Sequence, residues 1–113
     1  MTQKQDGEFY RGESWIVRGT INDEFGEAKD LTGATVKLRF TTGTTVVKEL
    51  VTPTDGAITS IPGGTYQFLI NEAGQTLFTA KAYAFELKAF FADGSSSVQN
   101  NGVITILPSK FNL

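Results

Sequence analysis

Apolar and polar residues alternate along residues 34–40, and this alternation limits the fold of the chain more than any other feature. Every second residue of the stretch is apolar: Ala34, Val36, Leu38 and Phe40. Successive side chains of a β-strand point to opposite faces, so the stretch predicts a strand with one face in a core and the other in water. A half-buried sheet is therefore the first element of the expected fold.

Residues 80–91 show the same pattern but leave an alternative open. The segment AKAYAFELKAFF contains many good helix formers, which favours a helix on propensity. Its bulky residues instead fall on alternate positions, at Tyr83, Phe85, Leu87 and Phe91. Pattern usually overrides propensity, so a strand is the expected structure and a helix the alternative.

Turn residues divide the rest of the chain at spacings of about ten residues. Turns or hairpins are expected at residues 22–26, 41–44, 53–56, 62–64, 93–94 and 100–102. Asn71 could cap one helical turn over Glu72 to Leu77. Between these turns lie seven to eight short strands, and this order is typical of an antiparallel sandwich or a small barrel.

The predicted core combines the two alternating stretches with the closing strand and leaves two choices open. Either Val103 or Ile104 joins Ile106 in the core. In residues 45–51, Val46 and Leu50 compete with Val47 and Val51 for the inner face. Trp15, the only Trp, lies beside Val17 and is expected to fill the core. The predicted core residues are Ala34, Val36, Leu38, Phe40, Tyr83, Phe85, Leu87, Val103 or Ile104, and Ile106.

The length and charge of the chain limit its organisation and its partners. With 113 residues, the chain is expected to form one β-sandwich domain over residues 9–113, preceded by a flexible polar arm at residues 1–8. The net charge of -2 argues against nucleic-acid binding. We expect no signal peptide and no contact with a membrane, because no apolar run approaches the ~20 residues of a membrane span.

The composition also argues against catalysis. The chain has no His and no Cys, which removes the commonest general base and the usual nucleophile systems. We therefore expect no enzyme activity, no catalytic residues, no cofactor and no metal. The acidic residues Asp23, Glu24, Glu27 and Asp30 could bind calcium, but they lack the spacing of a calcium loop, and a solvated turn is the favoured interpretation.

Four residues are candidates for an interface. If the strand over residues 83–91 keeps its register, Phe90 faces outward beside Lys88, where an apolar ring is unusual unless a partner covers it. A bend after Ala89 that hides the ring is the alternative. Phe9 and Tyr10 begin the ordered part of the chain, where the N-terminal arm could extend a sheet edge or supply an exchanged strand.

Taken in order, these motifs resemble a domain found in bacteriophage particles: the immunoglobulin-like N-terminal domain of baseplate upper proteins (BppU-like) and of related tail and neck proteins. An aromatic-containing strand (SWIVRGTI) is followed by a polar turn (DEFG) and the strand DLTGATVKL. A compressed T-x-x-L turn at Thr76 and Leu77 precedes the YAFEL strand. Asp93-Gly94 and the closing strand GVITI follow.

This resemblance implies an all-β, antiparallel, two-sheet immunoglobulin-like sandwich of seven to eight strands. It also implies a non-enzymatic structural protein of a phage or prophage virion: a tail, baseplate, neck or decoration subunit. Such a protein would dock to other virion proteins, could form a homo-oligomer, and would lie in the host cytoplasm before assembly. The alternative is a host-surface or carbohydrate-binding β-sandwich module, which would need exposed Tyr or Trp rings beside polar groups.

Overall fold

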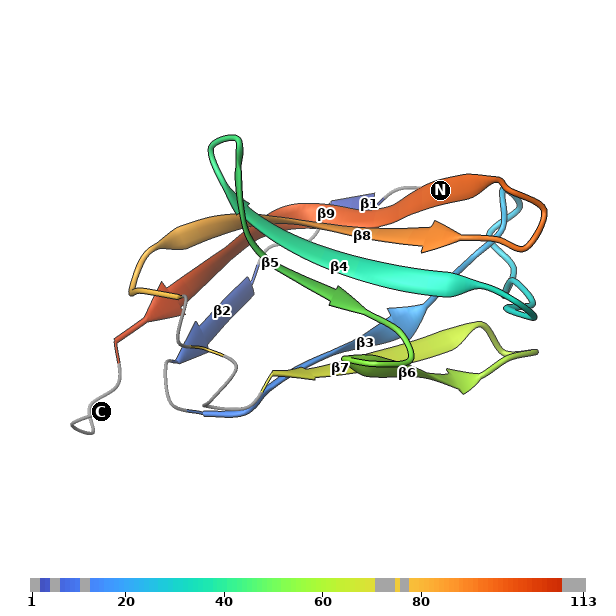
Figure 1. Ribbon diagram of the computed structural model, residues 1–113, viewed down its shortest axis with the longest axis horizontal. Helices are drawn as coiled ribbons and strands as arrows, with labels where there is room; N and C mark the ends of the chain where they lie inside the picture. Colours follow the sequence, from blue (N-terminus) through green and yellow to red (C-terminus); the bar gives the residue numbers. More distant parts are fainter. Residues whose placement is uncertain (1–2, 5–6, 11–12, 71–74, 76–77, 109–113) are drawn as a thin grey trace.

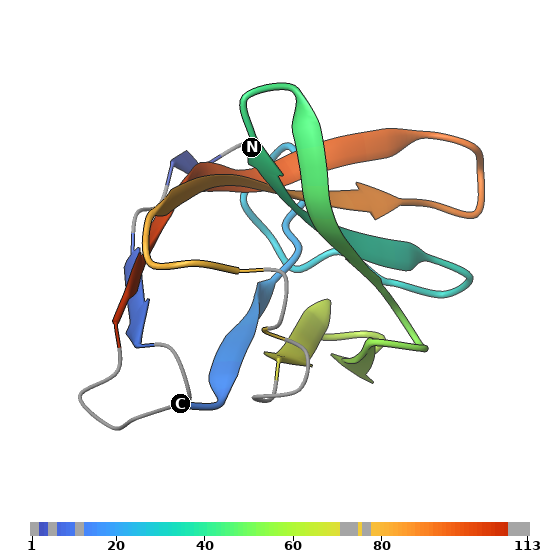
Figure 2. The same cartoon turned by 60° about the vertical axis from the view of Figure 1, so that its left-hand side comes forward.

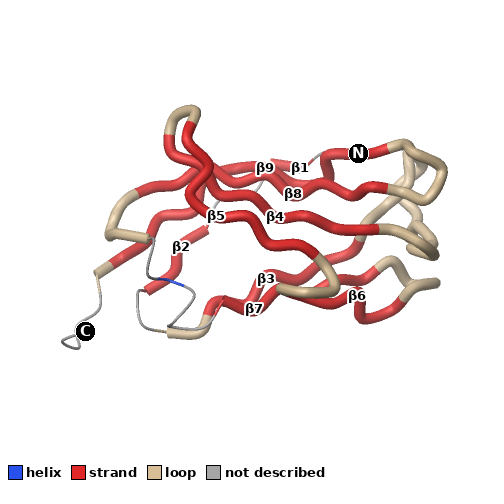
Figure 3. The backbone as a smooth tube through the Cα atoms, viewed as in Figure 1, coloured by secondary structure: helices blue, strands red, loops and turns tan. Residues whose placement is uncertain are grey.

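The computed structural model describes residues 3–4, 7–10, 13–70, 75 and 78–108, and these form a two-sheet β-sandwich (Figure 1). Nine strand segments are present in this part of the chain. β1 and β2 follow one another along the same neighbouring strand, so together they act as one interrupted edge strand, and on that count there are eight strands. The fold is therefore all-β, as the alternation predicts, and loops and turns connect the strands (Figure 3).

The larger sheet contains the two alternating stretches at its centre. Its strand order is β1 and β2, then β9, β8, β4 and β5. Cross-strand pairs such as Leu38 with Leu87 set the register between β4 and β8. The bounds are β1 (Gln3–Lys4), β2 (Gly7–Tyr10), β4 (Thr35–Thr42), β5 (Thr45–Val51), β8 (Ala82–Phe90) and β9 (Ser96–Leu107). The helical alternative for residues 80–91 is therefore wrong.

The smaller sheet consists of β3 (Trp15–Thr20), β7 (Thr65–Ile70) and β6 (Gly56–Ser60), in that order, and lies below the larger one in Figure 1. Gly19 lies opposite Tyr66 on the neighbouring strand. A Cβ on Gly19 would come within 2.7 Å of the Tyr66 hydroxyl, so only glycine allows this ring to lie against β3. The Tyr66 hydroxyl thereby reaches the larger sheet, where it accepts a hydrogen bond from Asn100 Nδ2 at 3.2 Å.

Two sequence expectations about the larger sheet need correction. β1 and β2 pair with β9 in parallel, whereas the other pairs are antiparallel, so the sandwich is not wholly antiparallel. The expected hairpin at residues 100–102 does not form either, because β9 runs through this segment. β8 pairs with β9 along its whole length, and this pairing overrides the local turn preference of Asn100, Asn101 and Gly102.

Two further expectations concern the N-terminal arm and the helical turn. Of the arm expected at residues 1–8, the described residues 3–4 and 7–8 pair along β9. The helical turn expected over Glu72 to Leu77 lies outside the described residues except for Gln75. The buried amide of Gln75 donates a hydrogen bond to the backbone carbonyl of Glu13.

The core lies between the two sheets and confirms most of the predicted residues. Fully buried members of the predicted set are Val36, Leu38, Phe40, Tyr83, Leu87 and Ile106, while Ala34, Phe85 and Ile104 are partly buried against them. Val103 is 40% exposed, so Ile104 is the inward residue of that pair. Trp15 is fully buried, as expected.

Two features of the core were not resolved from the sequence. Phe78 makes edge-on contacts with three aromatic rings, those of Trp15, Phe40 and Tyr83, with ring centroids 5.0–5.2 Å apart. In β5 a register shift opposite Phe40 and Thr41 changes the face that points inward. Leu50 is buried on one side of this irregularity and Val47 packs against the core on the other, so each proposed register is correct for one half of β5.

Candidate docking surfaces

The outer face of the larger sheet carries Phe90, as the alternation predicts. β8 keeps its register through Ala89, which is fully buried, and this places Phe90 on the opposite face. The ring is half-buried because two lysines cover it: Lys37 Nζ lies 5.0 Å and Lys88 Nζ 5.2 Å from its centroid. Both are cation–π contacts. The strand therefore does not bend to hide the ring in the core.

A shallow depression of about 110 Å³ surrounds this ring, and we call its lining residues the Phe90 face: Lys37, Arg39, Glu49, Glu86, Lys88 and Phe90. Arg39 forms an ion pair with Glu49, with a hydrogen bond of 2.7 Å from Nε to Oε2. Lys37 lies directly opposite Lys88, and two like charges in this position repel. Within the described residues neither lysine has an ion-pair partner, so the Phe90 face suits a partner that brings a carboxylate or an apolar side chain.

Phe9 and Tyr10, the other two interface candidates, lie on β2 and do not join the Phe90 face. Phe9 stacks on Trp15 with ring centroids 5.4 Å apart, so it supports the core. Tyr10 is 49% exposed, and its carbonyl oxygen accepts a 2.8 Å hydrogen bond from Trp15 Nε1. Tyr10 pairs with one end of β9 and Phe90 with the other, so the structure separates the predicted candidates into two groups.

A second exposed ring, Phe25, was missed by the sequence analysis. Phe25 belongs to the turn after β3, and its side chain is 80% exposed. The segment after β3 lies at the end of the molecule away from the marked C-terminus (Figure 1). The amide of Asp23 donates a hydrogen bond to the carbonyl of Glu27, and the carbonyl of Asp23 accepts one from the amide of Gly26. The carboxylate of Asp23 also accepts hydrogen bonds from the amides of Phe25 and Glu27. We call residues 23–27 the Phe25 loop. The only hint in the sequence was a large apolar residue inside a polar turn.

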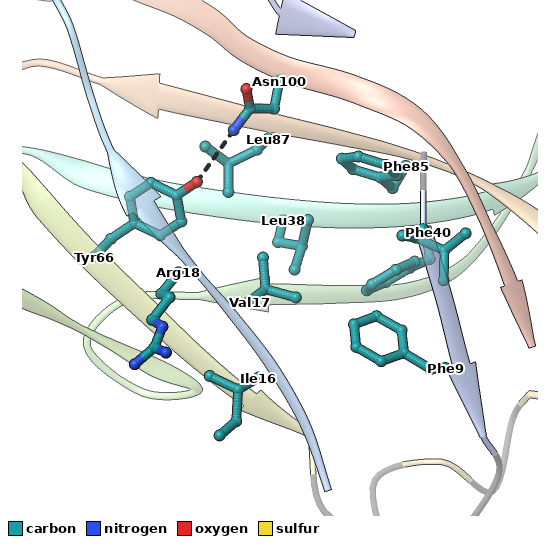
Figure 4. Close-up of a pocket in the computed structure, with 12 residues that line it drawn as sticks. Phe9, Ile16, Val17, Arg18, Leu38, Phe40, Tyr66, Phe85, Leu87 and Asn100 are labelled. Carbon is teal, nitrogen blue, oxygen red and sulfur yellow. Dashed lines mark hydrogen bonds between the residues drawn. The ribbon is translucent and has the colours of Figure 1, made fainter. Parts of the chain in front are cut away.

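A cavity of about 230 Å³ opens between the two sheets (Figure 4). It lies on the side where β2 and β3 form the edges of the two sheets (Figure 2). Its walls are mostly apolar, with Phe40 and Leu87 among the deepest residues. Tyr66 and Asn100 provide polar groups at one end, whereas the exposed side chain of Arg18 points away from the cavity, on the outer face of the smaller sheet (Figure 4). Burial raises the pKa of Tyr66, and the hydrogen bond from Asn100 opposes this shift. The phenol therefore stays neutral at physiological pH.

Two of the four acidic residues considered for calcium, Asp23 and Asp30, accept hydrogen bonds within turns. The carboxylate of Asp23 accepts hydrogen bonds within the Phe25 loop, and that of Asp30 accepts hydrogen bonds from the amide and hydroxyl of Thr32. Within the described part of the chain, no three carboxylate, His or Cys side chains come close enough to form a metal site. The described residues also contain no helix long and apolar enough to cross a membrane.

Comparison with known proteins yields similarity of fold alone. The sequence matches no family model and no curated protein. Among solved structures, the chain is similar to part of a candidate glycoside hydrolase from Bacteroides vulgatus, with 11% identity and a TM-score of 0.53 over 93% of this chain and 17% of that one. It is also aligned with extracellular domains 3–5 of Drosophila OTK, with 10% identity and a TM-score of 0.37 over 92% and 33% of the two chains.

Proposed function

We propose that this chain is a non-enzymatic structural component of a phage or prophage virion that docks to other virion proteins through the Phe90 face. The observation that supports the proposal is the position of three motifs that resemble those of phage tail and neck domains. DLTGATVKL leads into β4, YAFEL belongs to β8 and GVITI to β9, and these strands are neighbours in one sheet. Their outer surface carries the Phe90 face.

We further infer that the sandwich is of the immunoglobulin-like type. In such domains a sheet of strands A, B, E and D faces a sheet of strands C, F and G, to which further strands can be added, and the chain crosses between the two sheets. Here β3, β7 and β6 face the sheet that contains β9, β8, β4 and β5, and consecutive strands change sheet between β3 and β4 and between β7 and β8. β2 pairs in parallel with β9 and so extends the larger sheet at its edge. It does not cover the Phe90 face.

The alternative role in carbohydrate binding is less well supported by the side chains. Such a site would use an exposed Tyr or Trp ring to stack against a sugar. The only Trp and two of the three Tyr residues are buried: Trp15, Tyr66 and Tyr83 are 0–2% exposed. Tyr10 is the one remaining ring of this kind. The similarity to part of a candidate glycoside hydrolase is one of fold and brings no activity with it.

Co-purification with the products of neighbouring genes tests the proposal. We expect the chain to form a complex with a tail, neck or portal protein, and Phe90→Asp to weaken that complex at least about tenfold because it places a charge in an apolar contact. Leu69→Asp is the matched control, since Leu69 is 51% exposed on a strand of the other sheet. Binding to a glycan array without binding to any virion protein would contradict the proposal.

A further inference from the structure

The free edge of β3 carries backbone groups that the smaller sheet does not use. β3 pairs with β7 over its whole length, and within the described residues no strand lies on its other side. The amide of Ile21 donates a 2.7 Å hydrogen bond to the carbonyl of Gly64, which continues the ladder and sets its alternation. The odd-numbered residues of β3 therefore direct their amides and carbonyls to β7. The amides and carbonyls that point away from β7 belong to Ile16, Arg18 and Thr20.

Among the described edge strands, β3 alone lacks a feature that blocks pairing with another chain. Natural sheets protect their edges with short strands, bulges, lysines or prolines. β1 and β2 are short, with two and four residues. Register shifts interrupt the pairing of β5 with β4 and of β6 with β7. β3 is regular over six residues and contains neither Lys nor Pro. Its edge is therefore open to a further strand.

The cavity between the two sheets lies along this edge. Ile16, Val17 and Arg18 are the β3 residues that line it. The side chain of Val17 points toward the core, whereas those of Ile16 and Arg18 point to the outer face, so these two border the cavity with their backbone (Figure 4). Leu38 and Phe40 belong to its apolar wall. A strand beside β3 would direct every second side chain toward this cavity and the others to the outer face. Its inward residues should therefore be apolar.

Arg18 indicates what such a strand would carry on its outer face. The Arg18 side chain is exposed, and no described carboxylate forms an ion pair with it. Its neighbour on β7 is the uncharged Gln67. Cross-strand pairs of opposite charge stabilise a sheet, so an acidic residue beside Arg18 suits this position. The edge, the cavity and Arg18 together describe one kind of partner, an extended segment in which apolar and acidic residues alternate.

We propose that the free edge of β3 binds an extended segment of another virion protein. The segment pairs with the backbone of Ile16, Arg18 and Thr20, directs an apolar side chain into the cavity and places an acidic one beside Arg18. In this mode of recognition the backbone hydrogen bonds provide affinity and the alternate side chains provide specificity. The inference adds a second docking site, on the sheet opposite the Phe90 face, and rests on the proposed docking function for the source of the segment.

Hydrogen exchange of the full chain with a synthetic peptide tests this site. The acidic probe is acetyl-Thr-Val-Glu-Val-Glu-Val-Thr-amide, which has the proposed alternation. We expect it to protect the amides of Ile16, Arg18 and Thr20 and to leave those of Val17 and Gly19, already bonded to β7, unchanged. Two control peptides carry N-methyl groups on either the Glu or the Val residues, which removes the donors from one side of the peptide. One of the two should bind at least about tenfold more weakly than the probe, because it cannot donate to β3.

A charge exchange provides a second test that does not depend on the peptide backbone. Arg18→Glu should weaken binding of the acidic probe, because it places like charges across the contact. The same variant should bind a basic probe, in which Lys replaces each Glu, more tightly than the wild type does. Lys48→Glu is the matched control, since it makes the same change of charge on β5 of the other sheet. Circular dichroism of each variant verifies that the fold is kept.

Several results would overturn the inference. These are an acidic probe that does not bind at millimolar concentration, binding that leaves the even-numbered amides of β3 unprotected, and N-methylated peptides that both bind as the probe does. A chain that binds a tail, neck or portal protein while these amides stay unprotected would contradict this inference and leave the proposed function in place. A chain whose β3 edge binds the probe but which binds no virion protein would do the reverse.

Discussion

Phe25 and Phe90 are both apolar rings outside the core, but the molecule supports them in different ways. Phe90 belongs to β8, in the larger sheet, and two lysine side chains cover its ring. Phe25 lies in a five-residue loop, and 80% of its surface meets solvent. The backbone at Phe90 is held by pairing with β4, which is distant in the sequence. The loop that carries Phe25 is closed by hydrogen bonds among its own residues.

This difference separates two kinds of docking site. The Phe90 face is broad and charged, and a partner must displace or pair with Lys37 and Lys88 to reach the ring. The Phe25 loop offers an exposed ring, which a partner can contact without displacing other side chains. We therefore expect the Phe90 face to respond to the charge of its partner and the Phe25 loop to respond to the shape of its receptor.

The largest effect on stability is expected behind the Phe90 face. Leu38 is fully buried on β4 and lies opposite Leu87 of β8. Leu38→Ala should lower the free energy of unfolding by about 2–5 kcal/mol, because it removes core contacts and leaves a cavity. Chemical denaturation measures the change. Phe25→Ser in the same assay should change stability by less than about 0.5 kcal/mol, as surface substitutions do. A cost below about 0.5 kcal/mol for Leu38→Ala would contradict the register of the larger sheet.

A smaller effect is expected from Gly26→Ala, which tests whether the Phe25 loop is as ordered as its hydrogen bonds suggest. No atom lies within 4 Å of the added methyl group, so the cost of about 1 kcal/mol comes from the positive φ alone. Gly43→Ala is a matched control with a φ of 61° and equally open surroundings in the β4–β5 turn. Both should lower stability by similar amounts, but only Gly26→Ala should speed hydrogen exchange at the amides of Phe25 and Glu27. Equal exchange in the two variants would mean that the loop is not held by these bonds.

The smallest effect concerns the pKa of Asp30, in the turn before β4. A hydrogen bond from the Thr32 hydroxyl, followed by one from the Thr32 amide, lowers this pKa below the ordinary 3.8. Because the pKa is lower in the folded chain than in the unfolded one, the stabilisation is present above pH 3.8 and is lost as the pH falls through the folded value. Thr32→Val should raise the pKa of Asp30 in an NMR titration and leave that of Asp93, which is lowered by Ser95, unchanged. A parallel shift of both would contradict this local cause.

The sequence predicted what depends on local alternation and missed what depends on distant pairing. The alternation of apolar and polar residues at 34–40 and 83–90 predicted the two central strands of the larger sheet and the outward position of Phe90. The continuation of β9 through Asn100–Gly102 and the parallel edge of β2 could not be predicted, because both depend on hydrogen bonds to partners far away in the chain. The same holds for the cavity, whose wall combines residues from both sheets.

The Phe25 loop shows a different limit of prediction. The turn at residues 22–26 was predicted correctly from Asn, Asp and Gly, but the pattern of turn residues does not state how far a side chain inside the turn is exposed. The Asp23 carboxylate accepts hydrogen bonds from the backbone amides of Phe25 and Glu27, so this side chain helps to close the turn. Only the three-dimensional arrangement shows that the Phe25 side chain is 80% exposed.

The central claim is that this sandwich works by docking inside a virion, and a cryo-electron microscopy reconstruction of particles made by the genome that encodes it tests this claim most directly. The account predicts density for the sandwich in the tail, baseplate, neck or decoration layer, with the Phe90 face covered by a different virion protein. Particles that lack the sandwich, or that carry it with the Phe90 face open to solvent, would contradict the claim.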